Sequence, residues 1–152
     1  MYKVYSTQEL IKKAKAKPEN YALCLKSDCP LCDHCHRAIE AKNNKGDQLL
    51  IRIVNPLAIE KNDGECPAFR DSRKKIIYAI GFRSRMDAIN EDTRRVYKIL
   101  HSAFSNTHYY DMLNGNTLIT PEEQEFIRST AEKCGYNFTQ DDFDVLVEAD
   151  VW

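Results

Sequence analysis

The chain has 152 residues, of which 43% are hydrophobic and 30% are charged, and its formal net charge is −1 at pH 7. This size and composition predict a soluble globular protein of one domain, or of two small domains that share a core. The opening segment 1–17 is charged and lacks the apolar core of a signal peptide, and no stretch approaches the about 20 apolar residues of a membrane helix. We therefore expect a cytoplasmic protein without membrane contact, whose thiols stay reduced. In that setting clustered cysteines indicate a metal site rather than disulfides.

The charges are distributed unevenly along the chain. Residues 1–69 carry 11 Lys or Arg and 9 Asp or Glu, residues 70–98 carry 9 and 4, and residues 99–152 carry 2 and 10. The basic middle suits phosphate contacts, whereas the acidic end repels a nucleic-acid backbone and suits a basic protein partner.

Residue patterns in the N-terminal half of the sequence predict two helices and two strands. Ser6 and Glu9 form a capping-box pattern, which predicts a helix that ends before Pro18. A second helix is expected from Leu31 to Lys42. The β-branched runs at 49–54 and 76–80 predict strands.

The C-terminal half predicts helices. Apolar residues at helical spacing predict a helix from Glu91 to Phe104 and a short one from Thr107 to Leu113. The capping box Thr120 to Glu123 opens a further helix, on which we expect Phe126 to point inward. The acidic tail, which ends in Trp152, is expected to pack back on the body. The predicted fold class is α+β, with a cysteine-site region at 1–82, a helical region at 83–138 and a tail at 139–152.

Five cysteines of the N-terminal half form the main candidate site. Four follow the spacing C-x4-C-x2-C-x2-C, and the fifth precedes Pro67. Sets of four thiolates bind Zn²⁺ or an iron–sulfur cluster, and zinc is the cofactor that we expect. The spacing leaves two ligand sets open, namely Cys24, Cys29, Cys35 and Cys66, or Cys29, Cys32, Cys35 and Cys66. His36 lies beside these cysteines as an alternative ligand, and Cys134 is expected in a core.

A family resemblance favours the first of these sets. The segments YALC, ECPAFR, IIYAIGF and FDVLVEADVW, together with the Cys-Pro that follows YALC, resemble an uncharacterised Bacteroidetes protein family of about this length. The resemblance extends over nearly the whole chain. It implies that Cys24, Cys29, Cys35 and Cys66 are the ligands and that Cys32 is an additional thiol, and it implies no function.

A second resemblance concerns the helices after residue 99. The segment AFSNTHYYDMLNGNTLITPEEQEFI resembles the helix-turn-helix of phage-repressor-like regulators. It implies that Asn106, Thr107 and His108 face the bases of duplex DNA. Cations on the preceding helix would meet the phosphates: Arg94, Arg95 and Lys98. Asp111 departs from the pattern, since such helices usually carry a polar or basic residue there.

These patterns predict a zinc-stabilised regulatory protein that binds DNA. The alternatives are a protein-interaction or structural module without nucleic acid, and an iron–sulfur redox or sensor protein. The chain has no glycine-rich phosphate loop, no HExxH motif and no nucleophile in a recognisable setting, so we expect no enzymatic activity.

Overall fold

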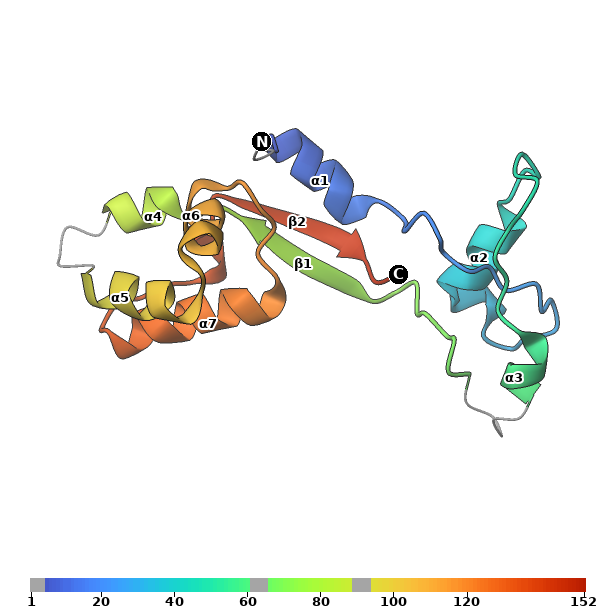
Figure 1. The fold of residues 1–152 in the computed structure, drawn as a ribbon. Helices are drawn as coiled ribbons and strands as arrows, with labels where there is room; N and C mark the ends of the chain where they lie inside the picture. The colour runs from blue at the N-terminus through green and yellow to red at the C-terminus, as the bar shows by residue number, and fades with distance from the viewer. Residues whose placement is uncertain (1–4, 61–65, 89–93) are drawn as a thin grey trace. The chain divides into compact units, whose positions relative to one another are not determined.

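The computed structural model of the chain describes residues 5–60, 66–88 and 94–152, and these form an α+β fold (Figure 1). The chain divides into two compact units. The helical unit comprises residues 1–16 and 76–149, and the cysteine unit comprises residues 17–75 and 150–152. The helical unit thus includes the start of the chain and residues 139–149 of the tail, whereas residues 150–152 belong to the cysteine unit. The division expected at 82/83 and 138/139 stays a prediction.

Two antiparallel strands form the sheet, β1 (Lys75–Ile80) and β2 (Val145–Asp150) (Figure 1). The strand predicted at 76–80 is confirmed, and the acidic tail supplies its partner. Ile119 forms an antiparallel bridge with Ala79 through two backbone hydrogen bonds of 3.0 and 2.8 Å.

Helices of the helical unit cover both faces of the sheet. Helix α1 (Thr7–Lys15) places Leu10 against Ile80 and Val147 on one face. On the other face lie α4 (Arg83–Ala88), α5 (Arg94–Ala103), α6 (Asn106–Asn114), α7 (Pro121–Lys133) and the 3₁₀ turn η2 (Gln140–Asp142). Successive side chains of a strand point to opposite faces of the sheet. Ala79 therefore packs against the helices α5, α6 and α7, and the next residue, Ile80, packs against Leu10 of α1.

The helix starts predicted after Ser6 and Thr120, and to within one residue the start predicted at Thr107, agree with the structure. Both capping boxes, at Ser6 and at Thr120, are formed in full. The Ser105 side chain caps α6 by accepting a hydrogen bond from the His108 N–H at 3.3 Å, and Gly115 ends that helix in the left-handed conformation. The start predicted at Glu91 lies outside the described residues, and α5 is described from Arg94.

An aromatic cluster forms the centre of the helical unit. Phe82 is fully buried, and its ring meets the rings of Tyr109, Phe138 and Phe143 edge-on, with centroids 6.3 Å apart in each case. Burial raises the pKa of Tyr109 to about 12. Just before Phe82, Gly81 has φ +70°, and a Cβ there would lie 2.4 Å from the Asp144 carboxylate.

The described residues of the cysteine unit include three short helical segments: η1 (Cys32–His34), α2 (His36–Lys42) and α3 (Pro56–Glu60). The single helix predicted from Leu31 to Lys42 is therefore wrong. Cys35 interrupts it with an extended backbone, because it forms an antiparallel bridge with Asp71.

The strand predicted at 49–54 is also wrong. Only Ile53 pairs there, in a single parallel bridge with Leu23, and Leu49 and Leu50 are 98% and 87% exposed. A β-branched run forms a strand only where a partner strand is available. The sheet is instead completed by the tail.

We expect Phe82→Ala to lower the free energy of unfolding of the helical unit by about 3–5 kcal/mol, because it empties the centre of the aromatic cluster. Phe126→Ala is the matched control, since Phe126 is 39% exposed and its loss should cost less than about 1 kcal/mol. Urea unfolding followed by far-UV circular dichroism measures both. Equal losses in the two variants would contradict this description of the core.

Candidate metal centre

Five cysteines line one small cavity of about 20 Å³ in the cysteine unit. They are Cys24, Cys29, Cys32, Cys35 and Cys66, the same five that the sequence marks as candidates. The rest of the lining is mainly apolar, with Leu31, Ala38, Ile59, Ala68 and Phe69. All six cysteines of the chain are unpaired thiols, and Cys134 packs against the core of the helical unit.

Tight turns hold the middle cysteines together. The Cys32 N–H donates to the Cys29 carbonyl at 3.0 Å, and the Cys35 N–H donates to the Cys32 carbonyl at 3.4 Å. Three cysteines thus lie on two consecutive turns at one side of the cavity.

Backbone pairing brings in the two distant cysteines. The Cys24 N–H donates to the Arg37 carbonyl at 3.1 Å, which ties the first segment to α2. The Cys35–Asp71 bridge brings the segment after Cys66 to the start of α2, and a turn in which the Phe69 N–H donates to the Cys66 carbonyl at 3.0 Å positions Cys66 itself.

Arg37 connects these segments, a role that no motif in the sequence indicated. Its Nε donates to the Ala68 carbonyl at 3.0 Å, and its Nη1 donates to the Ala22 carbonyl at 2.7 Å. The guanidinium also lies 4.5 Å from the centroid of the Tyr21 ring. A planar group with several donors suits this role, because it satisfies carbonyls of two chain segments at once.

A polar pair lies beside Cys32. The Lys42 ammonium is 2.9 Å from the Asp33 carboxylate and 3.9 Å from the Cys32 sulfur. The hydrogen bond from Lys42 lowers the pKa of Asp33, and the same bond raises the pKa of Lys42. Asp33 and Lys42 are both exposed, so this edge of the cavity faces solvent.

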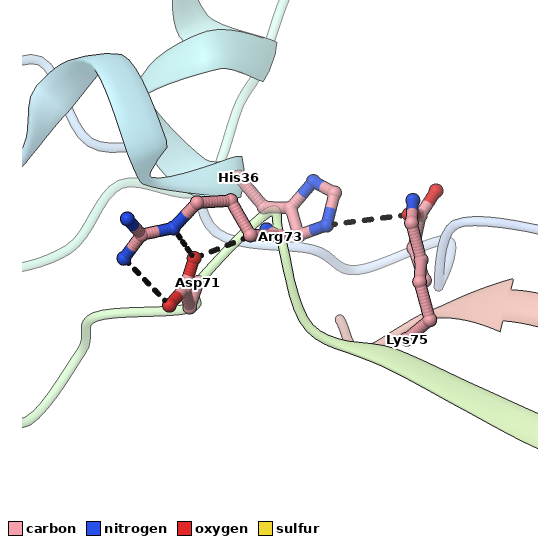
Figure 2. A network of polar contacts seen from close by, with 5 residues as sticks. His36, Asp71, Arg73 and Lys75 are labelled. Atoms are coloured by element: carbon pink, nitrogen blue, oxygen red, sulfur yellow. Dashed lines mark hydrogen bonds and ion pairs between the residues drawn. The ribbon is translucent and has the colours of Figure 1, made fainter.

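His36, the alternative ligand, does not line the cavity. Its ring packs against Trp152, with centroids 4.7 Å apart, and its Nε2 lies 3.6 Å from the Asp150 carboxylate (Figure 2). Trp152 also meets Tyr21 edge-on at 5.4 Å. The structure thus brings the five cysteines together and leaves His36 in an aromatic cluster.

A second pair in Figure 2 joins Asp71 to Arg73 through two side-chain hydrogen bonds of 2.9 and 3.0 Å. Asp71 is the residue that bridges Cys35. Hydrogen bonding to Arg73 lowers the pKa of the Asp71 carboxyl to about 2.

The part of the chain that the structure describes contains no group of three or more Cys, His, Asp or Glu side chains arranged to hold a metal ion. The chemistry of the cavity lining nevertheless fits one class of ligand. Five sulfurs with apolar neighbours suit a soft or borderline ion such as Zn²⁺, and not Mg²⁺ or Ca²⁺, which take oxygen ligands.

The predicted DNA-facing residues lie on the first turn of α6, where Asn106 and Thr107 are exposed and His108 is half-buried. Two of them are already engaged within the helical unit. The Asn106 Oδ1 is 2.6 Å from the His101 Nε2, and the His108 Nε2 is 2.7 Å from the Glu123 carboxylate.

The predicted phosphate contacts, Arg94, Arg95 and Lys98, are exposed on α5. Acidic residues are close to the same helices: Glu123 contacts His108, and Asp111 lies within α6 itself. The structure therefore places cations and carboxylates on neighbouring helices.

A shallow, open apolar hollow lies on the surface of the helical unit at the end of α5 and the start of α7. Ala103, Phe104, Glu122, Glu123 and Phe126 line it. The rings of Phe104 and Phe126 meet edge-on with centroids 5.5 Å apart. The expectation that Phe126 points inward is wrong, because its ring forms one wall of this hollow and stays 39% exposed.

Together these features define a small α+β protein with a cysteine-lined cavity in one unit and an acidic, apolar hollow in the other. The chain belongs to the family of unknown function DUF6078, whose model matches residues 7–152. No curated protein and no solved structure gives a significant match. Within the described ranges, no helix has the length and apolar character needed to cross a membrane.

We expect the contribution of the Asp71–Arg73 pair to stability to be complete above pH 4 and to disappear as the pH falls through about 2. The sign follows from the lowered pKa, because the carboxylate is favoured in the folded state relative to its ordinary value of 3.8. An NMR titration of the Asp71 carboxyl carbon measures this. A midpoint for Asp71 near 3.8 would contradict the geometry.

Proposed function

We propose that this chain is a metal-stabilised protein-interaction module. In this proposal the cysteine unit holds one structural Zn²⁺ through Cys24, Cys29, Cys35 and Cys66, and the helical unit presents a surface to a partner protein. The proposal assigns no catalysis.

The observation that carries the metal proposal is the scarcity of a core in the cysteine unit. Among its described residues, the buried hydrophobic ones are Leu23, Cys35 and Ala38. So few buried side chains supply little hydrophobic stabilisation, and units of this size commonly depend on a metal or on disulfides. Because all its thiols are unpaired, a metal is the device that the lining chemistry supports.

The size of the cavity favours one ion over a cluster. A volume of about 20 Å³ holds about one water molecule. Zn²⁺ takes four ligands in structural sites, commonly with some close together in the sequence and others from further along the chain. Cys29 and Cys35 lie on consecutive turns, and Cys24 and Cys66 come from two other segments, so these four cysteines offer that connectivity. Metal binding would then be part of the folding of this unit. An iron–sulfur cluster remains the alternative cofactor.

We expect the full chain, purified in the presence of zinc, to contain about one zinc per molecule by elemental analysis. Cys24→Ser and Cys66→Ser should each lose most of the zinc and expose the backbone of residues 17–75 to hydrogen exchange. Cys134→Ser is the matched control, because its thiol packs in the helical unit, and it should keep both metal and protection.

Two results would contradict the zinc proposal. Absorption near 400 nm in anaerobically purified protein would indicate an iron–sulfur cluster. Unchanged metal content and unchanged exchange in both Cys24→Ser and Cys66→Ser would remove the metal hypothesis altogether.

The partner surface that we propose is the hollow between Phe104 and Phe126. Its apolar walls accept a hydrophobic anchor, and Glu122 and Glu123 give its rim a negative charge. The segment from residue 99 onward carries 2 Lys or Arg against 10 Asp or Glu. This charge complements a partner helix that carries apolar residues flanked by Lys or Arg.

DNA binding through α6 is the second candidate, supported by the exposed Asn106 and Thr107 and by the exposed cations of α5. The internal bonds of Asn106 and His108 make it the weaker one, since bidentate recognition of adenine needs a free Asn amide. The resemblance of this segment to a helix-turn-helix and the Bacteroidetes origin both stay predictions.

We expect the full chain to bind a synthetic amphipathic peptide of Leu and Lys with micromolar affinity, weakened by salt, and to ignore the same peptide with Glu in place of Lys. Phe126→Ala should weaken binding about tenfold, because it removes one wall of the hollow. Leu146→Ala, which removes a similarly exposed apolar side chain from β2, is the control. Fluorescence anisotropy measures both variants.

The same assay with duplex DNA at about 50 mM salt separates the two candidates. Suppose that the chain binds DNA tightly, that Arg95→Ala and Lys98→Ala abolish this binding, and that the peptide does not bind. This result would overturn the proposed protein-interaction function in favour of DNA binding. Equal peptide binding by wild type and Phe126→Ala would show that the hollow is not the surface.

A further inference from the structure

We propose that Cys32 is an oxidation-sensitive thiol that releases the metal of the cysteine unit. In the presence of peroxide it would form a disulfide with Cys29 or Cys35 and so remove a ligand. This inference rests on the proposed zinc site and concerns its regulation.

The number of sulfurs carries the first step. Five thiols line the cavity, and a structural zinc takes four. With Cys24, Cys29, Cys35 and Cys66 as ligands, Cys32 is the thiol without a metal bond, and it lies in the same cavity as those that have one. An uncoordinated thiol keeps its sulfur lone pairs available for reaction.

The turns supply the second step. Cys32 stands at the centre of two overlapping Cys-x-x-Cys sequences, three residues from Cys29 and three from Cys35. Both pairs are closed by backbone hydrogen bonds, of 3.0 and 3.4 Å. A turn closed in this way brings the two Cα atoms within about 7 Å, and disulfides span Cα distances of about 4.4–6.8 Å. The Cα spacing of these turns is therefore compatible with either disulfide.

Access supplies the third step. Cys32 is partly exposed, as are Cys24, Cys29 and Cys66, whereas Cys35 is buried. What distinguishes Cys32 is the polar, exposed pair beside it. The Cys32 sulfur lies 3.5 Å from the Asp33 carboxylate and 3.9 Å from the Lys42 ammonium. Both Asp33 and Lys42 are exposed. A small polar oxidant such as hydrogen peroxide can reach Cys32 from this polar edge of the cavity.

The reaction balances with hydrogen peroxide as the oxidant. The Cys32 sulfur attacks the O–O bond and becomes a sulfenic acid, and one water leaves. The sulfur of Cys29 or Cys35 then attacks the Cys32 sulfur, forms the S–S bond and releases the second water. The Zn–S bond of the attacking Cys29 or Cys35 breaks in this step, and solvent supplies the proton that completes the second water. One thiol and one zinc-bound thiolate lose two electrons, one peroxide gains them, and the zinc ion keeps its charge and is released because one of its four ligands is lost. A thiol reductant reverses the step.

The test uses the zinc-loaded full chain, with zinc release followed by a chromogenic chelator and disulfides mapped by mass spectrometry. With about one equivalent of hydrogen peroxide, we expect the wild type to release its zinc and to form a disulfide that includes Cys32. Cys32→Ser should release zinc at least about tenfold more slowly. Cys134→Ser is the matched control and should behave like the wild type.

Three outcomes would overturn the inference. Zinc release from Cys32→Ser at the wild-type rate would show that the ligands themselves react with peroxide. A low zinc content of Cys32→Ser before peroxide would make Cys32 a ligand. A disulfide that excludes Cys32 would remove it from the reaction. Failure of the zinc site itself is visible separately, as the absence of zinc in the wild type before peroxide is added.

Discussion

The structure of residues 17–75 depends on the convergence of three chain segments on one small cavity. Little else is buried: Leu23, Cys35 and Ala38 are the buried hydrophobic residues among those described in this unit, and Cys35 and Ala38 themselves line the cavity. Arg37 satisfies carbonyls of two of these segments, and the bridge between Cys35 and Asp71 fixes a third. A unit built in this way gains most from a bond that joins all segments at once, which is what a metal between thiolates provides.

The helical unit is stabilised in a different way from the cysteine unit. Its stability comes from apolar packing on both faces of a two-stranded sheet, with Phe82 at the centre of an aromatic cluster. One protein thus contains a unit with a packed apolar core and a unit in which few hydrophobic side chains are buried and five thiols line a small cavity. The proposed metal and the proposed partner surface belong to different units for this reason.

The surface chemistry of the helical unit follows from which polar groups the fold already uses. Asn106 and His108 look like base-reading residues in the sequence, but contacts with His101 and Glu123 engage them. The side chains of Phe104 and Phe126 instead remain open beside Glu122. A polar residue identifies a recognition surface only when its hydrogen-bonding groups remain free, and an acidic, apolar surface suits a cationic protein segment better than a phosphate backbone.

The sequence by itself determined the features that depend on neighbours along the chain. Both capping boxes, the Gly115 helix end and the strand at 76–80 follow from residues a few positions apart, and the cysteine spacing marked the five thiols that line the cavity. Tertiary structure decided the rest. Pairing with Asp71 broke the expected helix at Cys35, and the tail completed the sheet in place of residues 49–54. Packing against Trp152 kept His36 away from the thiols, and the role of Arg37 had no sequence signal. These outcomes depend on contacts between residues far apart in the chain, where local propensity is overridden by whichever pairing buries more surface and satisfies more backbone groups.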